Sequence, residues 1–323
     1  MLLADDTPSH LEFVRTLRKH PNPRQTIRVQ RIQPTAEEPG TLDDGQDNTL
    51  VNIRTRSLGA TPPTEAVTIA VGAAAARVAL QRPGNDPLLL TLISRLDYQD
   101  LRDVLDSTRA RSRRISVQLR DPALAEQLRL MGTLLPTQRR LGVLVADSAD
   151  PVLKELREVA AGWQIEVEAA PDAKTLTTAL RTLLPRSDML LILPNTIGNS
   201  SAATLTILQA ANDANKPVFG TNEAMVRSGA LAAVVSLPSQ LSLQAPALAD
   251  ELTTETEGTF FAKTLTAAWP SATRLNQAVA THLRISIPSE EALSQKLGFP
   301  CNERLPAAPC KPMPSSSERK TAP

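Results

Sequence analysis

The sequence predicts an α/β protein built of two doubly wound, Rossmann-like lobes joined by a hinge. The chain of 323 residues is longer than a single hydrophobic core usually supports. Between residues 140 and 237, short apolar runs alternate regularly with amphipathic stretches, as expected of parallel strands connected by helices. The part before residue 118 repeats this alternation less cleanly and predicts a sister lobe.

The first lobe is expected to begin with a strand at residues 2–4 and a helix from Pro8 to about Lys19. Apolar runs predict further strands at residues 26–32, 67–72 and 87–93, with a short helix through Ala76. The polar stretch at residues 35–65 is interpreted as a loop or insertion with a weak helix around residues 50–53.

The second lobe is expected to follow a helix at residues 121–136. Its strands are predicted at residues 141–146, 165–169, 189–194, 217–220 and 231–237, each four to seven residues long and nearly continuous in apolar side chains. A strand-like run, "LRISIP" at residues 283–288, indicates that the chain returns to the first lobe. The predicted division is therefore residues 1–118 with part of 239–300 for the first lobe, and 119–238 for the second.

Residues 300–323 are rich in Pro, Ser and charged side chains and are predicted to be a disordered tail. Both cysteines, Cys301 and Cys310, fall in this tail. A local disulfide there would have little structure to stabilise, so neither thiol is expected to have a functional role.

The overall charge excludes some partners. Lys and Arg total 35 against 34 Asp and Glu, a net charge of +1, so the chain lacks the basic excess that binding to nucleic acid requires. No apolar run approaches the roughly 20 residues that span a bilayer.

Predicted helix starts indicate where a ligand binds. Thr7, Asp121 and Asp150 each precede a proline, and Asn222 and Ser289 each precede Glu, so all five are expected to cap helices. In a parallel sheet these starts follow the carboxyl ends of strands, and free N–H groups gather at that edge. A ligand is expected there.

The motifs of several enzyme classes are missing. The sequence contains no glycine-rich dinucleotide fingerprint, phosphate loop or G-x-S-x-G elbow. His10, His20 and His282 lack metal-ligand spacing and are expected at the surface. The rival interpretation is an enzyme with Asp6 or Asp147 as base, but no second titratable group is predicted to converge on either. The chain is therefore expected to be no enzyme and to hold no cofactor or metal.

Three segments carry a resemblance to a known family. Residues 190–241, "LLILPNTIGNSSAATLTILQAANDANKPVFGTNEAMVRSGALAAVVSLPSQL", resemble the substrate-binding proteins of ABC transporters, which have the class I periplasmic-binding-protein-like fold. The "LLPTQRRLGVLVAD" segment at residues 134–147 and "VTIAVGAAAARVAL" at residues 67–80 are similar to the linker helix and first-lobe strand of that family.

The resemblance implies a monomeric solute-binding component of an ABC-type importer, with a permease and an ATPase as partners. A small polar molecule, with an amino acid as the preferred class, is expected between the lobes. The resemblance also implies a periplasmic location. Residue 1 lies directly before the expected first strand, so we expect either a truncated start or a cytoplasmic ligand sensor of the same fold. The expected ligand-binding residues are Thr7, Gly72, Ser94 and Tyr98 in the first lobe and Asp147, Asn195, Thr196, Thr221 and Asn222 in the second.

Overall fold

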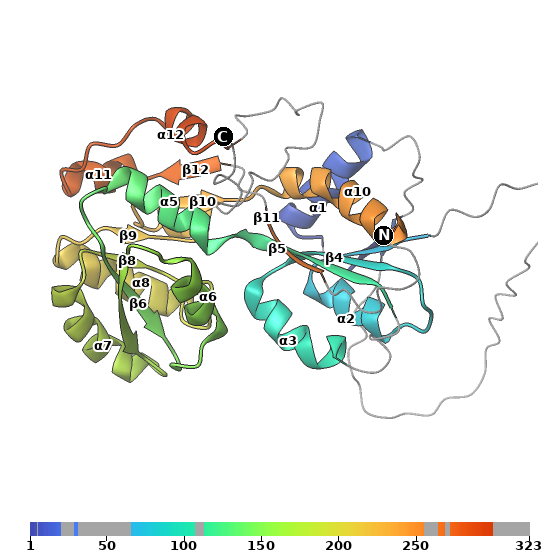
Figure 1. Cartoon of the computed structure of the whole chain (residues 1–323), viewed down its shortest axis with the longest axis horizontal. Coiled ribbons are helices and arrows are strands. Elements are labelled where there is room, and N and C mark those ends of the chain that lie inside the picture. Colours follow the sequence, from blue (N-terminus) through green and yellow to red (C-terminus); the bar gives the residue numbers. More distant parts are fainter. Residues whose placement is uncertain are drawn as a thin grey trace, which may run out of the picture.

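The predicted α/β fold with two doubly wound lobes is confirmed by a computed structural model (Figure 1). The structure describes residues 1–4, 6–20, 29–31, 66–106, 113–254, 264–268 and 272–299. Among these residues it contains two six-stranded sheets, and we define the first and second lobes by them. The predicted tail at residues 300–323, its two cysteines and the predicted insertion at residues 35–65 lie outside the described residues.

The first sheet has the strand order β11-β5-β4-β3-β1-β2, and all its pairings are parallel. Its strands are β1 (Leu2–Leu3), β2 (Gln30–Arg31), β3 (Thr68–Val71), β4 (Leu88–Ile93), β5 (Ile115–Pro122) and β11 (Thr264–Ala268). Helices α2 (Ala73–Gln81) and α3 (Arg95–Leu105) cover one face, and α1 (Pro8–Lys19) and α10 (Pro238–Thr254) cover the other.

The second sheet has the order β12-β10-β9-β8-β6-β7, and within it only β10 and β12 pair in antiparallel fashion. Its strands are β6 (Arg140–Val145), β7 (Gln164–Ala169), β8 (Met189–Leu191), β9 (Val218–Phe219), β10 (Ala232–Val235) and β12 (Ala272–Leu275). One face is covered by α5 (Leu124–Leu134), α6 (Pro151–Val159), α11 (Gln277–His282) and α12 (Glu290–Lys296). The other face is covered by α7 (Ala173–Arg186), α8 (Ser201–Asp213) and α9 (Glu223–Arg227).

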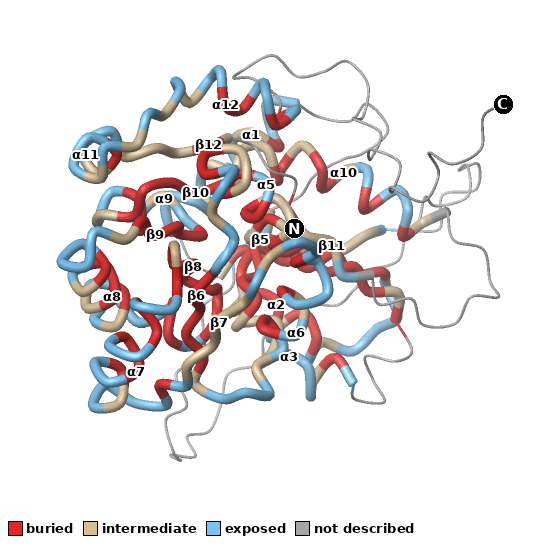
Figure 2. Tube along the Cα trace, turned by 60° about the vertical axis from the view of Figure 1, so that its left-hand side comes forward, coloured by how far each residue is buried: buried red, intermediate tan, exposed pale blue. Residues whose placement is uncertain are grey.

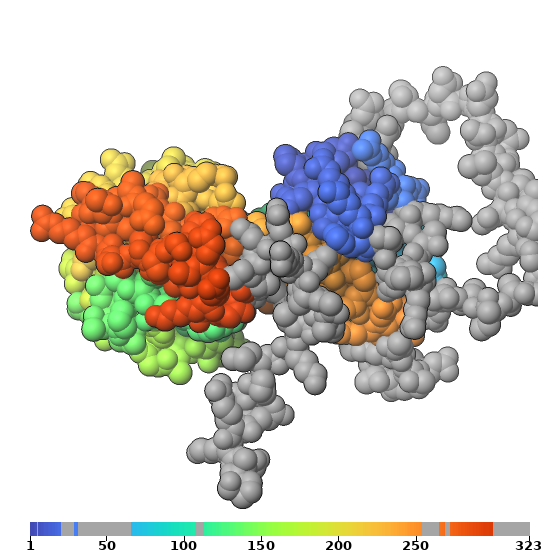
Figure 3. All heavy atoms as spheres, turned by 90° about the horizontal axis from the view of Figure 1, so that it is seen from above, coloured from blue at the N-terminus to red at the C-terminus, as the bar shows by residue number. Residues whose placement is uncertain are grey.

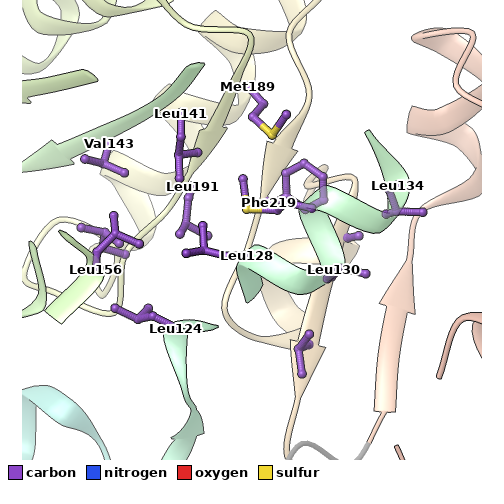
Figure 4. Close-up of a cluster of buried hydrophobic side chains, with 14 of the residues drawn as sticks. Leu124, Leu128, Leu130, Leu134, Leu141, Val143, Leu156, Met189, Leu191 and Phe219 are labelled. Carbon is purple, nitrogen blue, oxygen red and sulfur yellow. The ribbon is translucent and has the colours of Figure 1, made fainter. Parts of the chain in front are cut away.

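Burial on both faces explains why the inner strands are continuously apolar. In β4, Leu88 and Leu90 pack under α2 and α3, whereas Leu89 packs against α1 and α10. Figure 2 shows inner strands such as β6 and β8 as largely buried segments, with exposed stretches on the helices outside them. In the second lobe, side chains also alternate between the two faces of each strand. Leu141 and Val143 of β6 therefore lie in the cluster drawn in Figure 4, together with Phe219 of β9.

The chain passes between the lobes more than once. Strand β5 belongs to the first sheet and leads through Pro122 into α5 of the second lobe. From β10 the chain returns to the first lobe as α10, which packs on α1, as the space-filling view in Figure 3 also shows. The segment after β11 belongs to the second sheet again through β12.

Two local predictions were wrong. Asp121 does not cap a helix, because β5 continues through Pro122 and α5 begins after Ala123, whose side chain makes no capping bond. The "LRISIP" run forms no strand: residues 283–289 connect α11 to α12, and Ile285 and Ile287 pack against the second-lobe core instead. Apolar side chains in a connecting segment can produce the same pattern as a short strand.

Candidate functional site

A cleft with a volume of about 790 Å³ opens between the two lobes, at the carboxyl ends of strands from both sheets. From the first lobe, residues just beyond β1, β3 and β4 reach it: Thr7, Gly72 and Ser94. From the second lobe, residues just beyond β9 and β10 reach it: Thr221, Asn222 and Ser236. Parallel strands make this possible, because all their carboxyl ends lie along one edge of each sheet.

On the first-lobe wall, Thr7 and Gly72 begin helices α1 and α2. Thr7 Oγ1 accepts a hydrogen bond of 3.3 Å from the His10 N–H and so caps α1. Gly72 has a φ of +83° and makes no side-chain cap, and Ala73 and Ala74 at the start of α2 line the cleft beside it.

Ser94 begins α3 with a complete capping box. Its hydroxyl accepts a 3.0 Å hydrogen bond from the Asp97 N–H and donates to the Asp97 carboxylate, which also accepts from the Ser94 N–H at 3.2 Å. Ser94 and Asp97 therefore present a fixed acceptor group to the cleft.

Asp121 lies beside them, where β5 leaves the first lobe. Its Oδ2 accepts a 3.0 Å hydrogen bond from the Arg95 N–H, and Arg120 Nε lies 4.0 Å from its Oδ1. Burial raises the pKa of the Asp121 carboxyl above its usual value, because desolvation outweighs the lowering by Arg120 and by the Arg95 N–H. A desolvated carboxylate facing a cleft can bind a cationic group strongly.

On the second-lobe wall, Thr221 is buried and Asn222 is exposed. Asn222 Oδ1 accepts a 2.9 Å hydrogen bond from the Met225 N–H and caps α9. The Thr221 N–H and hydroxyl approach Met225 Sδ at 3.4 and 3.7 Å. Sulfur is a weak acceptor, so Thr221 retains capacity to bind a polar ligand.

The other four expected residues are not in the cleft lining. Asp147 is exposed, and its Oδ1 accepts from the Ala149 N–H at 3.0 Å in its own turn. Tyr98 packs partly buried against the core under α3, because it lies one turn past the cleft end of that helix. Thr196 is exposed on the turn after β8.

Asn195 is buried and bonded on every side. Its Nδ2 donates to the Leu144 carbonyl at 3.2 Å and to Asp150 Oδ2 at 2.8 Å, and its Oδ1 accepts from the Gly198 N–H at 3.0 Å. These bonds tie the turn after β8 to β6 and to the start of α6. The arrangement gives Asn195 a structural role.

The sequence did not predict several charged residues as ligand-binding residues that line the cleft, although it singled out Asp121 as a helix cap. These are Arg77, Asp97, Arg120, Asp121 and Glu223, and His10, expected at the surface, joins them. Helix periodicity was an available signal for two of them: His10 and Asp97 are the third residues after the caps Thr7 and Ser94, in the first helical turn.

No group of metal-ligating side chains occurs among the described residues, and within the same part of the chain no helix is long and apolar enough to cross a membrane.

The family model described as ABC transporter substrate binding protein matches residues 115–257, from β5 to the end of α10. The predicted resemblance to ABC transporter substrate-binding proteins is confirmed. The match covers the second-lobe wall of the cleft and the segments on either side that lead into the first lobe. No curated protein matches the sequence.

Solved structures of substrate-binding proteins share the fold. A substrate binding protein with adhesive properties from Clostridium difficile, in its ligand-free open form, superposes with a TM-score of 0.59 at 16% identity, covering 90% of this chain and 95% of the other. The ABC domain from Streptococcus pneumoniae in complex with L-Trp gives 0.51 at 15% identity, covering 92% and 98%. At these identities the likeness shows the two-lobed fold of the periplasmic binding proteins.

Proposed function

We propose that the chain is the solute-binding component of an ABC-type import system and that it binds a small polar molecule in the cleft between its lobes. The observation that carries this proposal is the cleft, which is lined by strand-end residues from both lobes. Its volume of about 790 Å³ suits a small solute. A ligand that contacts both walls stabilises a closed arrangement, because only there can both sets of groups bind it.

The cleft favours a ligand with charges of both signs. Asp97 and Asp121 supply carboxylates from the first lobe, and Arg77 and Arg120 supply guanidinium groups within the same cleft. An ammonium group fits the carboxylates and a ligand carboxylate fits the arginines. None of the described lining residues is Phe, Tyr or Trp, which disfavours ligands that depend on ring stacking. We therefore propose an amino acid or a similar zwitterion.

The proposed binding residues are Thr7, Gly72, Ser94, Thr221 and Asn222, joined by Asp97 and Asp121. Each of them lines the cleft. The pairing of β11 with β5 and of β12 with β10 supports a lobe division in which the described residues of 1–121 and 238–268 form the first lobe. In this proposal residues 122–237 and 272–299 form the second lobe, and the protein acts as a monomer outside the cytoplasm with a permease and an ATPase as partners.

Calorimetric titration of the purified chain with common L-amino acids, and with neutral sugars of similar size, tests the proposal. We expect saturable binding by one or more amino acids, accompanied by a smaller radius of gyration in small-angle X-ray scattering. N-acetylation of the bound amino acid should abolish binding, because it removes the ammonium charge. Binding of a neutral sugar instead would refute the zwitterion but keep the solute-binding role. Uptake of the labelled ligand that persists after deletion of the gene would refute the import role.

A further inference from the structure

An ion pair that is buried on its arginine side joins the two lobes beside the cleft. Arg95, the first residue of α3 in the first lobe, donates through Nη1 to Glu155 Oε2 on α6 in the second lobe. Figure 1 shows α3 and α6 on the sides of the lobes that face each other, and the rotated view in Figure 2 agrees. Among the described residues, each of the other ion pairs lies within one lobe, with one exception. Arg120 and Asp121 form a pair as neighbours in β5, the strand that connects the lobes.

Arg95 is held rigidly by the first lobe. It follows the Ser94 cap, and its N–H donates to Asp121 Oδ2 at 3.0 Å, where β5 leaves for the second lobe. The backbone of Arg95 is thus fixed to the end of the connecting strand. The Arg95 side chain is only 9% exposed, so its guanidinium lies in a largely desolvated position.

Helix α6, which carries Glu155, is firmly packed in the second lobe. Helix α6 begins at the Asp150 cap, and it buries Val152, Leu153 and Leu156 in the second-lobe core. Because both partners are fixed to their own lobes, a change in lobe orientation changes the distance between them. Because the Arg95 side chain is buried, its own motion can compensate little for a change in the distance to Glu155.

The Glu155 carboxylate is important for the stability of the buried Arg95 guanidinium, because Arg95 has few other partners. Among the described residues its Nε has no hydrogen-bond partner, and Glu155 is the carboxylate that forms an ion pair with its guanidinium. A buried guanidinium that loses its carboxylate is strongly destabilised, since desolvation is then uncompensated. Lobe orientations that separate the pair are therefore disfavoured relative to the one described here.

We propose that the Arg95–Glu155 ion pair is an interlobe latch that holds the orientation in which the cleft is accessible and so controls how readily the lobes move. The latch lies one residue from the cleft-lining Ser94 and is bonded to cleft-lining Asp121. A ligand bound at Asp97 and Asp121 contacts the same helix start that carries Arg95. The proposal concerns lobe orientation alone and does not rest on the identity of a ligand or on transport.

Distance measurements between spin labels test the latch directly. Labels are placed on cysteines introduced at the exposed positions Arg102 on α3 and Thr177 on α7, with Cys301→Ser and Cys310→Ser to remove the native thiols. Pulsed electron-electron double resonance then gives the interlobe distance distribution without ligand. We expect a narrow distribution for the parent chain, a broader one for Glu155→Gln, and a broader and shifted one for Glu155→Arg, which places two cations together.

The control variant is Glu168→Gln, which removes the carboxylate that pairs with Arg186 inside the second lobe. It should leave the distribution unchanged. The charge-swapped double variant, Arg95→Glu with Glu155→Arg, should narrow the distribution again. If Arg95→Glu prevents folding, the two Glu155 variants still test the proposal, because the Glu155 side chain is 36% exposed and its replacement disturbs less buried packing than a change at Arg95. Distributions identical to the parent in both Glu155 variants would overturn the latch while leaving the proposed solute binding intact.

Discussion

The His10 ring packs against Gly72 on the first-lobe wall of the cleft, in the space where a side chain at position 72 would lie. A Cβ built on Gly72 would lie 2.6 Å from His10 Cε1 and 2.8 Å from Nε2, closer than real Cβ contacts. Gly72 also has a φ of +83°, a conformation that side chains with a Cβ rarely adopt. Backbone conformation and side-chain packing thus both require glycine here.

Gly72→Ala is therefore expected to destabilise the chain and displace His10. The positive φ alone costs about 1–3 kcal/mol of unfolding free energy, measurable by urea denaturation. Gly162→Ala is the matched control, because Gly162 has nearly the same φ of +82° and nothing within 4 Å of its Cβ position. Equal losses for the two variants would mean that the contact with His10 contributes nothing.

Asn195→Ala is expected to lower stability without lowering ligand affinity. The substitution leaves the Gly198 N–H, the Leu144 carbonyl and the Asp150 carboxylate short of a partner. Unsatisfied buried groups of this kind cost about 1–3 kcal/mol each, so the melting temperature should fall. Exposed Thr196→Ala, one residue along, should leave it unchanged. A large loss of affinity in calorimetric titration would restore the original prediction of a ligand-binding role for Asn195.

Asn222→Ala separates a capping role from a ligand-binding role. The loss of the cap on α9 should cost about 1 kcal/mol of unfolding free energy. Ser289→Ala removes a similar cap from α12, whose N-terminus is not among the residues that line the cleft. Both variants should lose stability, but only Asn222→Ala should weaken binding of the amino acid found by titration. Equal affinities for the two variants would show that Asn222 is a cap alone.

Asp121→Asn is expected to raise stability at neutral pH while weakening the binding of a cationic ligand group. Burial raises the pKa of Asp121, so the folded state holds its proton more tightly than the unfolded chain. Its contribution to stability is thus fully present below the unfolded pKa and is lost as pH rises through the raised folded pKa. Asparagine removes this dependence and can still accept from the Arg95 N–H.

Urea denaturation from acid to neutral pH measures the effect. Asp172→Asn serves as a comparison of opposite sign, because hydrogen bonds from the Thr175 N–H and hydroxyl lower the pKa of Asp172. The stability that Asp172 contributes is present above its unfolded pKa and is lost as pH falls through the folded pKa. A stability–pH profile for Asp121→Asn that parallels the parent would contradict the desolvation of Asp121.

The sequence by itself determined the order of strands and helices between residues 140 and 237 of the second lobe and several helix starts. Continuous apolar runs such as residues 189–194 identified strands covered on both faces, because every side chain of such a strand meets a buried layer. Thr7, Asp150 and Asn222 were correct as caps, since the capping bond spans only two or three residues. The edge at which the cleft opens followed from the parallel order of the strands.

Only the tertiary structure decided which strand-end side chains face the cleft. Asn195 follows a strand just as Thr221 does, yet it turns inward because Leu144 and Asp150, about fifty residues away in the chain, offer partners for its amide. The Arg95–Glu155 pair likewise joins residues 60 positions apart on different lobes. The local sequence pattern determines the direction of the backbone and the starts of the helices. The direction of a side chain depends instead on neighbours that folding brings together from distant parts of the chain. A local pattern does not encode those neighbours.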